Sequence, residues 1–217
     1  MLTRQDQTVS DCLDVLAHIA PLNLRHIGFK DLGADLPTLR TLNQRIQRSG
    51  ARSYLEVVAT SREAALNSAA MAVEIGVNML LGGTLIAETL RILYGTGIAY
   101  YPFPGTPTGH PTKLGGTAAK IAADTASFME MGCAGVDLLA YRATEADPIA
   151  LVTAAKSALG PKGKLIVAGN VDSPARIKTL RAAGADAFTI GSAAFDGSFS
   201  PRKGSLLNQL ADIIACV

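Results

Sequence analysis

Two charged residues stand inside apolar segments of the sequence that read as strands. Lys30 ends the segment His26–Lys30, and Glu56 lies within Tyr54–Val58. If alternate residues of a strand point to the same side, Lys30 shares the interior face with Gly28, and Glu56 points the same way from the next strand. Charged groups in such positions are costly unless they are paired or take part in chemistry. We therefore predict that both are catalytic, the alternative being a structural ion pair.

Further candidates lie at the ends of other apolar segments. Asp137 stands early in one of them and is either a second acid–base group or an interior hydrogen-bond acceptor. Tyr141 and Arg142, at its end, are candidates for substrate binding, and Arg142 suits a substrate carboxylate if it is not merely a surface residue of a loop. Arg4 and Asp6 follow the first apolar residues of the chain and are candidates for the rim of a site, although a solvated loop is slightly preferred for them.

The segment 103–117 is the most unusual part of the sequence. It is rich in Gly, Pro and Thr and is longer than a typical connection between a strand and a helix. Loops of this kind often act as lids or contact the substrate. His110, between Gly109 and Pro111, is a candidate general acid or base near neutral pH, or else only a hydrogen-bonding residue of the loop.

Two segments near the end of the chain, 168–174 and 190–195, combine glycine with small polar residues. Glycine lets the backbone approach an anion closely, and N–H groups near helix starts attract one. The Asn170 side chain is suited to a phosphate or a substrate hydroxyl, although Gly169 and Asn170 would also suit an ordinary turn. The residues predicted to bind phosphate are Gly169, Asn170, Gly191 and Ser192.

These residues are expected to lie on a repeating pattern of strands and helices. Short apolar segments without alternation are typical of parallel strands covered by helices. They occur at residues 26–30, 54–58, 78–81, 99–103, 136–141, 165–168 and 187–190, with a short first strand at 1–3. Helices between them are indicated by a capping box at Thr60 and Glu63, by Ser173–Pro174, and by glycines at the predicted helix ends, namely Gly50, Gly76, Gly95, Gly132, Gly160 and Gly184.

Eight such units predict an α/β fold in which residues 1–217 form one (β/α)8 TIM barrel domain, with Leu206–Cys216 as its last helix. A doubly wound open sheet is the alternative and is disfavoured by the strand count. In such a barrel, chemistry lies at the carboxyl ends of the strands, and phosphate commonly lies after strands seven and eight.

Residues 168–195, including Arg181–Ser192, resemble the ribulose-phosphate-binding barrel superfamily over about an eighth of the chain. That group includes histidine- and tryptophan-pathway barrels, amino-sugar phosphate epimerases and ketogluconate-phosphate aldolases. The resemblance implies a phosphorylated substrate. Two departures stand out: Asn170 follows Gly169 where many relatives have a second glycine, and strand six offers Asp137 and Tyr141 where the aldolases have their lysine.

Three functions remain open. The leading hypothesis is an aldolase-type carbon–carbon lyase that acts on a small phosphorylated keto-sugar or keto-acid, with Lys30 as a Schiff-base lysine of lowered pKa and Glu56 moving protons. The alternative is a phosphosugar isomerase or epimerase in which Glu56 and Asp137 move a proton while Lys30 polarises oxygen. The third is a non-catalytic barrel that binds a phosphorylated metabolite.

Composition limits the kinds of partner that the protein is expected to bind. The net charge of +2, without a basic run, argues against nucleic acid, and no segment is apolar enough for a membrane. The polar start and three cysteines without metal-ligand spacing indicate a cytoplasmic protein. Assembly as a homo-oligomer is a separate expectation, since barrels of this kind often dimerise. The three histidines are dispersed, so no metal or other cofactor is expected, although a divalent ion held by Glu56, Asp137 and substrate oxygens stays open.

Overall fold

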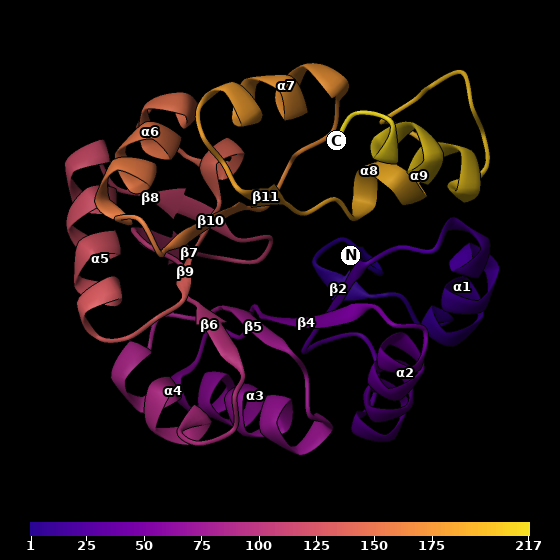
Figure 1. The fold of residues 1–217 in the computed structure, drawn as a ribbon, viewed down its shortest axis with the longest axis horizontal. Helices are drawn as coiled ribbons and strands as arrows, with labels where there is room; N and C mark the ends of the chain where they lie inside the picture. The colour runs from indigo at the N-terminus through magenta and orange to yellow at the C-terminus, as the bar shows by residue number, and fades with distance from the viewer.

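Eight short strands surround the centre of the molecule, and helices cover them on the outside (Figure 1). The computed structural model describes all residues from 1 to 217. The predicted (β/α)8 barrel is confirmed. Its strands are β1 Thr3–Arg4, β3 His26–Lys30, β4 Arg52–Val57, β5 Met79–Gly82, β6 Ala99–Tyr101, β9 Gly135–Leu138, β10 Lys164–Val167 and β11 Ala187–Phe188.

Hydrogen-bonded ladders join β3 to β6 in one parallel sheet and β9 to β11 in another. Between β6 and β9 the ring continues through two single backbone hydrogen bonds. The Ala134 amide donates to the Tyr100 carbonyl at 2.9 Å, and the Asp137 amide donates to the Pro102 carbonyl at 3.0 Å. The two sheets therefore meet edge to edge on this side.

The first residues of the chain join the opposite edges. The amino group of Met1 donates to the Ile190 carbonyl at 2.7 Å, and the Leu2 amide donates to the Gly28 carbonyl at 2.7 Å. The N-terminus accordingly lies inside the ring in Figure 1. The predicted short first strand is confirmed, but it continues into an antiparallel hairpin with β2 (Gln7–Thr8) that the sequence pattern did not reveal.

The helices follow the strands in the predicted order. They are α1 Cys12–Ile19, α2 Leu36–Arg48, α3 Arg62–Ile75, α4 Ile86–Leu93, α5 Ala118–Glu130, α6 Pro148–Ala158, α7 Pro174–Ala182, α8 Ser192–Phe195 and α9 Leu206–Ile214, with 3₁₀ turns η1 Ala20–Leu22 and η2 Ala140–Arg142. None of them is long and apolar enough to cross a membrane.

Helix starts and ends largely follow the predicted signals. Ser173 accepts a hydrogen bond from the Arg176 amide at the start of α7, as expected. The start of α3 differs by one residue, because Ser61 rather than Thr60 accepts from the Ala64 amide. All six predicted glycine stops have a positive φ, the conformation that a helix end requires of the residue after it.

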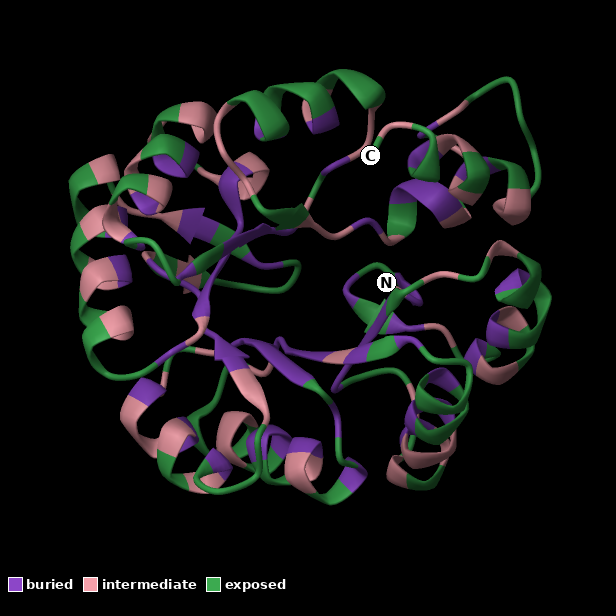
Figure 2. Ribbon diagram, in the orientation of Figure 1, coloured by how far each residue is buried: buried purple, intermediate pink, exposed green.

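Strand residues alternate between two cores, as predicted for β3 and β4. Ile27 and Phe29 pack with the helices outside the barrel, whereas Tyr54 packs with a small interior cluster that includes Leu81, Tyr101 and Ile166. Strands β5 and β9 are fully buried, and β3, β4 and β10 are mostly buried beyond their exposed first residues, whereas β11 is exposed or half-buried (Figure 2). Lys30 and Glu56 are direct register partners, so both point into the barrel on the interior side.

The long segment after β6 folds into a second hairpin, formed by β7 (Thr106–Thr108) and β8 (Lys113–Gly115). The sixth strand is shorter than predicted, because Tyr141 and Arg142 belong to the 3₁₀ turn η2 and not to β9. The Arg142 amide donates to the Leu139 carbonyl at 2.9 Å, so the chain leaves the sheet direction after β9.

Candidate functional site

A cavity of about 210 Å³ opens at the carboxyl ends of the strands. Its walls come from residues far apart in the chain, which the closed barrel brings together. Of the residues singled out from the sequence, the cavity is lined by Asp6, Lys30, Glu56, Arg142, Gly169, Asn170, Gly191 and Ser192. This is the face of the barrel on which enzymes of this architecture carry out their chemistry.

A buried ion-pair cluster forms one wall of the cavity. The Lys30 Nζ lies 2.9 Å from Asp6 Oδ1 and 3.0 Å from Glu56 Oε1, and each of the three side chains is 4–6% exposed. Asp6 reaches this position from the tight turn between β1 and β2, where its φ is +60°. The lysine is thus held between two carboxylates from neighbouring strands.

Asp6 also binds Arg142 through both of its oxygens. The Arg142 Nη1 lies 2.6 Å from Asp6 Oδ2, and Nη2 lies 2.8 Å from Asp6 Oδ1, which is a bidentate pair. The Thr112 amide donates to Asp6 Oδ2 at 3.2 Å, so the β7–β8 hairpin contacts the cluster as well. Asp6 is therefore the residue that links the first strand, the hairpin and the turn after β9.

These contacts fix the charges of the cluster. Burial by itself would raise the pKa of Asp6, but the hydrogen bond from Arg142 and the charge of Lys30 hold it well below its usual range. Burial would likewise lower the pKa of Lys30, but the carboxylates of Glu56 and Asp6 raise it above its ordinary value. The lowered lysine pKa expected from the sequence is therefore wrong for this arrangement, because that prediction considered desolvation without the second carboxylate.

Asp137 lies inside the barrel but does not line the cavity. It is fully buried, and neither of its carboxyl oxygens has a hydrogen-bond partner. Burial and the neighbouring charge of Glu56 raise the pKa of Asp137 well above its ordinary value. Asp137 therefore keeps its proton to a higher pH than an ordinary carboxyl group, whereas Asp6 loses its proton at a lower one.

The opposite wall presents backbone N–H groups. Those of Asn170, Gly191, Ser192 and Ala193 donate to no acceptor in the protein, and all four residues line the cavity. The Nδ2 of the Asn170 side chain donates to the Tyr141 carbonyl at 3.3 Å, and its predicted part in phosphate binding stays a prediction. The arrangement is suited to an anionic group held by main-chain donors.

Three candidates from the sequence lie away from the cavity walls. Arg4 is exposed and donates to the Phe195 carbonyl at 2.8 Å. Tyr141 lies under the Arg176 guanidinium, which stands 4.5 Å from its ring centre. His110 is exposed in the turn between β7 and β8. The hairpin instead reaches the ion-pair cluster through the buried Thr112, which the sequence interpretation did not single out.

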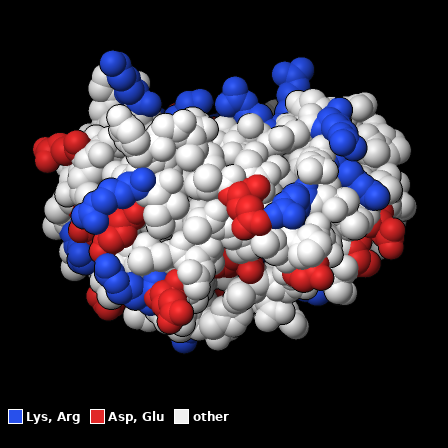
Figure 3. All heavy atoms as spheres, turned by 90° about the horizontal axis from the view of Figure 1, so that it is seen from below, with Lys and Arg blue, Asp and Glu red and all other residues white.

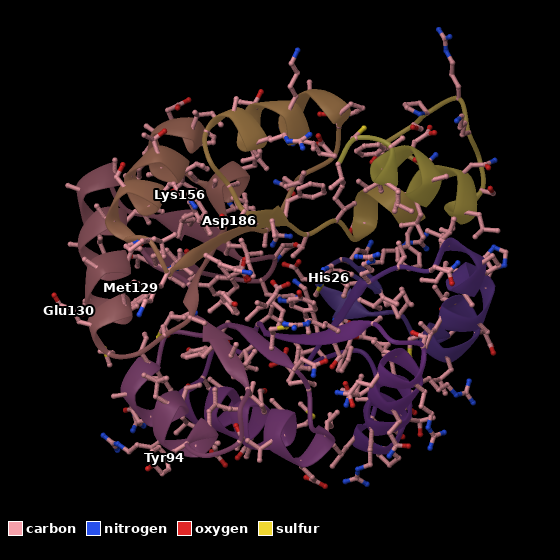
Figure 4. All side chains as sticks on the ribbon, viewed as in Figure 1. His26, Tyr94, Met129, Glu130, Lys156 and Asp186 are labelled. Atoms are coloured by element: carbon pink, nitrogen blue, oxygen red, sulfur yellow. The ribbon has the colours of Figure 1, made fainter.

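The other end of the barrel carries pairs of polar side chains. His26 Nδ1 lies 2.7 Å from Tyr54 Oη, and Lys156 Nζ lies 2.7 Å from Asp186 Oδ2 (Figure 4). On the face shown in Figure 3, Lys and Arg are interspersed with Asp and Glu, without a broad patch of one sign. No three His, Cys, Asp or Glu side chains gather into a group suited to a metal ion.

Solved structures with the same fold match this chain over almost its whole length. One described as native KDPGal has a TM-score of 0.69 at 13% identity and covers 95% of this chain and 87% of its own. A 3-hexulose-6-phosphate synthase matches with a TM-score of 0.66 at 14% identity, covering 97% and 96%. The N-acetylmannosamine-6-phosphate 2-epimerase from Clostridium perfringens matches with 0.63 at 10% identity, covering 97% and 90%.

The resemblance inferred from residues 168–195 is thus confirmed at the level of the fold. No family model matches the sequence, and no curated protein shows significant similarity to it. At identities this low, likeness of structure establishes the barrel and leaves the reaction to be argued from the side chains.

Proposed function

We propose that this protein is an enzyme that moves a proton beside the carbonyl group of a small phosphorylated keto-sugar or keto-acid, as an isomerase or epimerase does. The observation that carries the proposal is the charged Lys30 between Asp6 and Glu56, facing a wall of unpaired N–H groups across one cavity. Two of the similar structures bear names of phosphorylated sugars, which agrees with a phosphate at that wall.

In this proposal each group of the cavity has a defined role. The substrate phosphate accepts hydrogen bonds from the N–H groups of Asn170, Gly191 and Ser192. An ammonium group has three N–H donors, and the two carboxylates occupy two of those of Lys30, which leaves one for the substrate carbonyl oxygen. The negative charge that develops on that oxygen is stabilised by the buried cation.

Glu56 is the proton carrier in this proposal. It lines the cavity and lies 3.0 Å from Lys30, so a carbon acid whose carbonyl is bound by Lys30 is within its reach. Glu56 takes the proton from the carbon beside the carbonyl, which forms an enediolate, and returns it to the other face of that carbon or to the former carbonyl carbon. In the second case the proton of the neighbouring hydroxyl passes to the former carbonyl oxygen, so that carbonyl and hydroxyl exchange places. Asp137 is buried behind this wall and has a raised pKa. Its part in the proton transfer and the binding of a divalent ion together with Glu56 remain proposals from the sequence.

An imine-forming aldolase is the second candidate, and one observation favours it: Lys30 is the sole lysine that lines the cavity. For this reaction Lys30 must first give its proton to Glu56 and then attack the carbonyl carbon, with loss of water. The raised pKa of Lys30 opposes that first step. For this reason proton transfer without an imine is the better-supported reaction.

The decisive experiment compares the protein with Lys30→Arg and Lys30→Ala, using a panel of phosphorylated keto-sugars and keto-acids. In D₂O, the proton-transfer function predicts incorporation of deuterium beside the substrate carbonyl, with partial activity in Lys30→Arg because the charge is kept. Borohydride should trap no adduct. An adduct on the unaltered protein that is lost in both variants would instead establish the aldolase reaction.

The remaining expectations from the sequence, a cytoplasmic location, assembly as a homo-oligomer and activity without a cofactor, stay predictions. A panel that binds to the protein without turnover or deuterium exchange would favour the non-catalytic metabolite-binding barrel.

A further inference from the structure

We propose that Asp6 determines the substrate class of this cavity, which accepts phosphorylated sugars with an uncharged, hydroxylated carbon chain and rejects phosphorylated keto-acids. The inference rests on the proposed function for the position of the phosphate and narrows the substrate that this function leaves open. It follows from the partners of the cationic groups that face the cavity.

Arg142 is the cation that would ordinarily bind a substrate carboxylate, and it is already occupied. Both of its terminal nitrogens bind Asp6, at 2.6 and 2.8 Å, and Nη1 also donates to the Thr112 carbonyl at 3.2 Å. This end-on pair uses the edge of the guanidinium formed by Nη1 and Nη2, and the Nε atom lies against Gly169, where a Cβ would stand only 2.5 Å from it. Arg142 thus presents little unpaired charge to a ligand.

The other two amines at the cavity, those of Lys30 and Met1, also have partners within the protein. Lys30 is shared between Asp6 and Glu56, so the two cations Lys30 and Arg142 and the two carboxylates of the cluster balance one another. The Met1 amino group donates to the Ile190 carbonyl at 2.7 Å, and burial lowers its pKa to about 6, which leaves it mostly uncharged at neutral pH. Each cation on the wall opposite the N–H groups proposed to bind phosphate therefore already has a carboxylate partner.

Asp6 is too firmly held to make way for a substrate carboxylate. It is 5% exposed and accepts hydrogen bonds from Lys30, Arg142 and the Thr112 amide. A substrate carboxylate placed here would add a third negative charge to a buried cluster that contains only two cations, and like charges repel strongly in such a setting. Sugar hydroxyls, in contrast, donate hydrogen bonds to these same carboxylates.

The test uses ligands that differ in this one group and have no carbonyl to react. Glucitol 6-phosphate and 6-phosphogluconate share their carbon chain and phosphate, but one ends in CH₂OH where the other ends in a carboxylate. Their dissociation constants are measured by calorimetry, with inorganic phosphate as competitor. We expect the protein to bind glucitol 6-phosphate about tenfold more tightly or better, and both to be displaced by phosphate.

Two variants identify the residue responsible. Asp6→Asn removes the charge and frees Arg142, so it should narrow the ratio of the two dissociation constants about tenfold by strengthening the binding of 6-phosphogluconate. Asp196→Asn is the matched control, since Asp196 lines the same cavity but is exposed and contacts only the Ser198 amide through its side chain. It should change both affinities by a similar factor. Circular dichroism checks that each variant is folded.

The outcomes separate the inference from the proposed function. Equal binding of the two ligands by the unaltered protein, or tighter binding of 6-phosphogluconate, overturns the inference and leaves the phosphate site in place. Binding of neither ligand overturns the phosphate site and the inference together. If Asp6→Asn does not fold, the ratio of the two dissociation constants for the unaltered protein still decides whether the cavity rejects a carboxylate. Glu56→Gln, which leaves the Asp6–Arg142 pair intact, should then narrow this ratio to a smaller extent.

Discussion

Replacing Gly169 by alanine should destabilise the protein by displacing Arg142. Gly169 has a φ of +74°, and a Cβ atom built on it would lie 2.5 Å from the Arg142 Nε and 2.7 Å from its Cδ. Ordinary contacts between such atoms are about 3.5–4.0 Å, so the arginine must move by roughly 1 Å. A shift of that size breaks the geometry of its bidentate pair with Asp6.

Two costs add up in this variant. A side chain in the left-handed region costs about 1–2 kcal/mol. Weakening of charge-assisted hydrogen bonds costs about 1.5–3 kcal/mol, and the lower part of that range applies because the Arg142 side chain, 16% exposed, can recover some hydration. The free energy of unfolding should therefore fall by about 2–4 kcal/mol.

Urea unfolding followed by circular dichroism measures this loss, and Gly76→Ala provides the matched control. Gly76 has a nearly identical φ of +75°, but nothing lies within 4 Å of a Cβ at that position. The control should lose only about 1–2 kcal/mol, which is the backbone cost alone. In an Arg142→Ala background, Gly169→Ala should cost no more than the control. Equal losses for the two glycine variants in the unaltered background would refute the contact between Gly169 and Arg142.

Three further predictions concern the charges of the site and its surroundings. Asp137 has a raised pKa in the folded state, so its ionisation opposes folding above about pH 4. In urea titrations, Asp137→Asn should therefore gain stability relative to the unaltered protein as pH rises from about 4 to about 8. A difference in the free energy of unfolding that does not depend on pH would contradict the raised pKa. Asp6 has a lowered pKa, so its stabilisation is present above about pH 4 and is lost as pH falls below that value. The destabilisation of Asp6→Asn should therefore shrink on acidification from about pH 4 to about pH 2 in urea titrations. His110→Ala should change kcat/KM less than about threefold in steady-state assays, because the His110 side chain is exposed and lies outside the cavity. A loss of kcat/KM above about a hundredfold would instead show that the β7–β8 hairpin closes over the substrate.

Local patterns in the sequence were sufficient for the barrel and for part of its site. Continuous apolar segments and glycine stops define the order of strands and helices, because burial on both faces of a strand and the left-handed conformation at a helix end each restrict residue type locally. The same reasoning located Lys30 and Glu56, since alternation along two neighbouring strands requires only their spacing. Gly169 and Gly191 followed from their positions after the last two strands.

The charge state of the site was decided by the tertiary structure. Asp6 and Arg142 are 136 positions apart, and nothing in either segment indicates that they form a bidentate pair. That contact requires closure of the barrel, which brings the turn after β1 beside Lys30 and the turn after β9. The pKa of Lys30 depends on how many carboxylates surround it, and this number depends on strands that neither its own segment nor that of Glu56 specifies. Sequence spacing therefore placed the lysine, and long-range packing determined that it is charged.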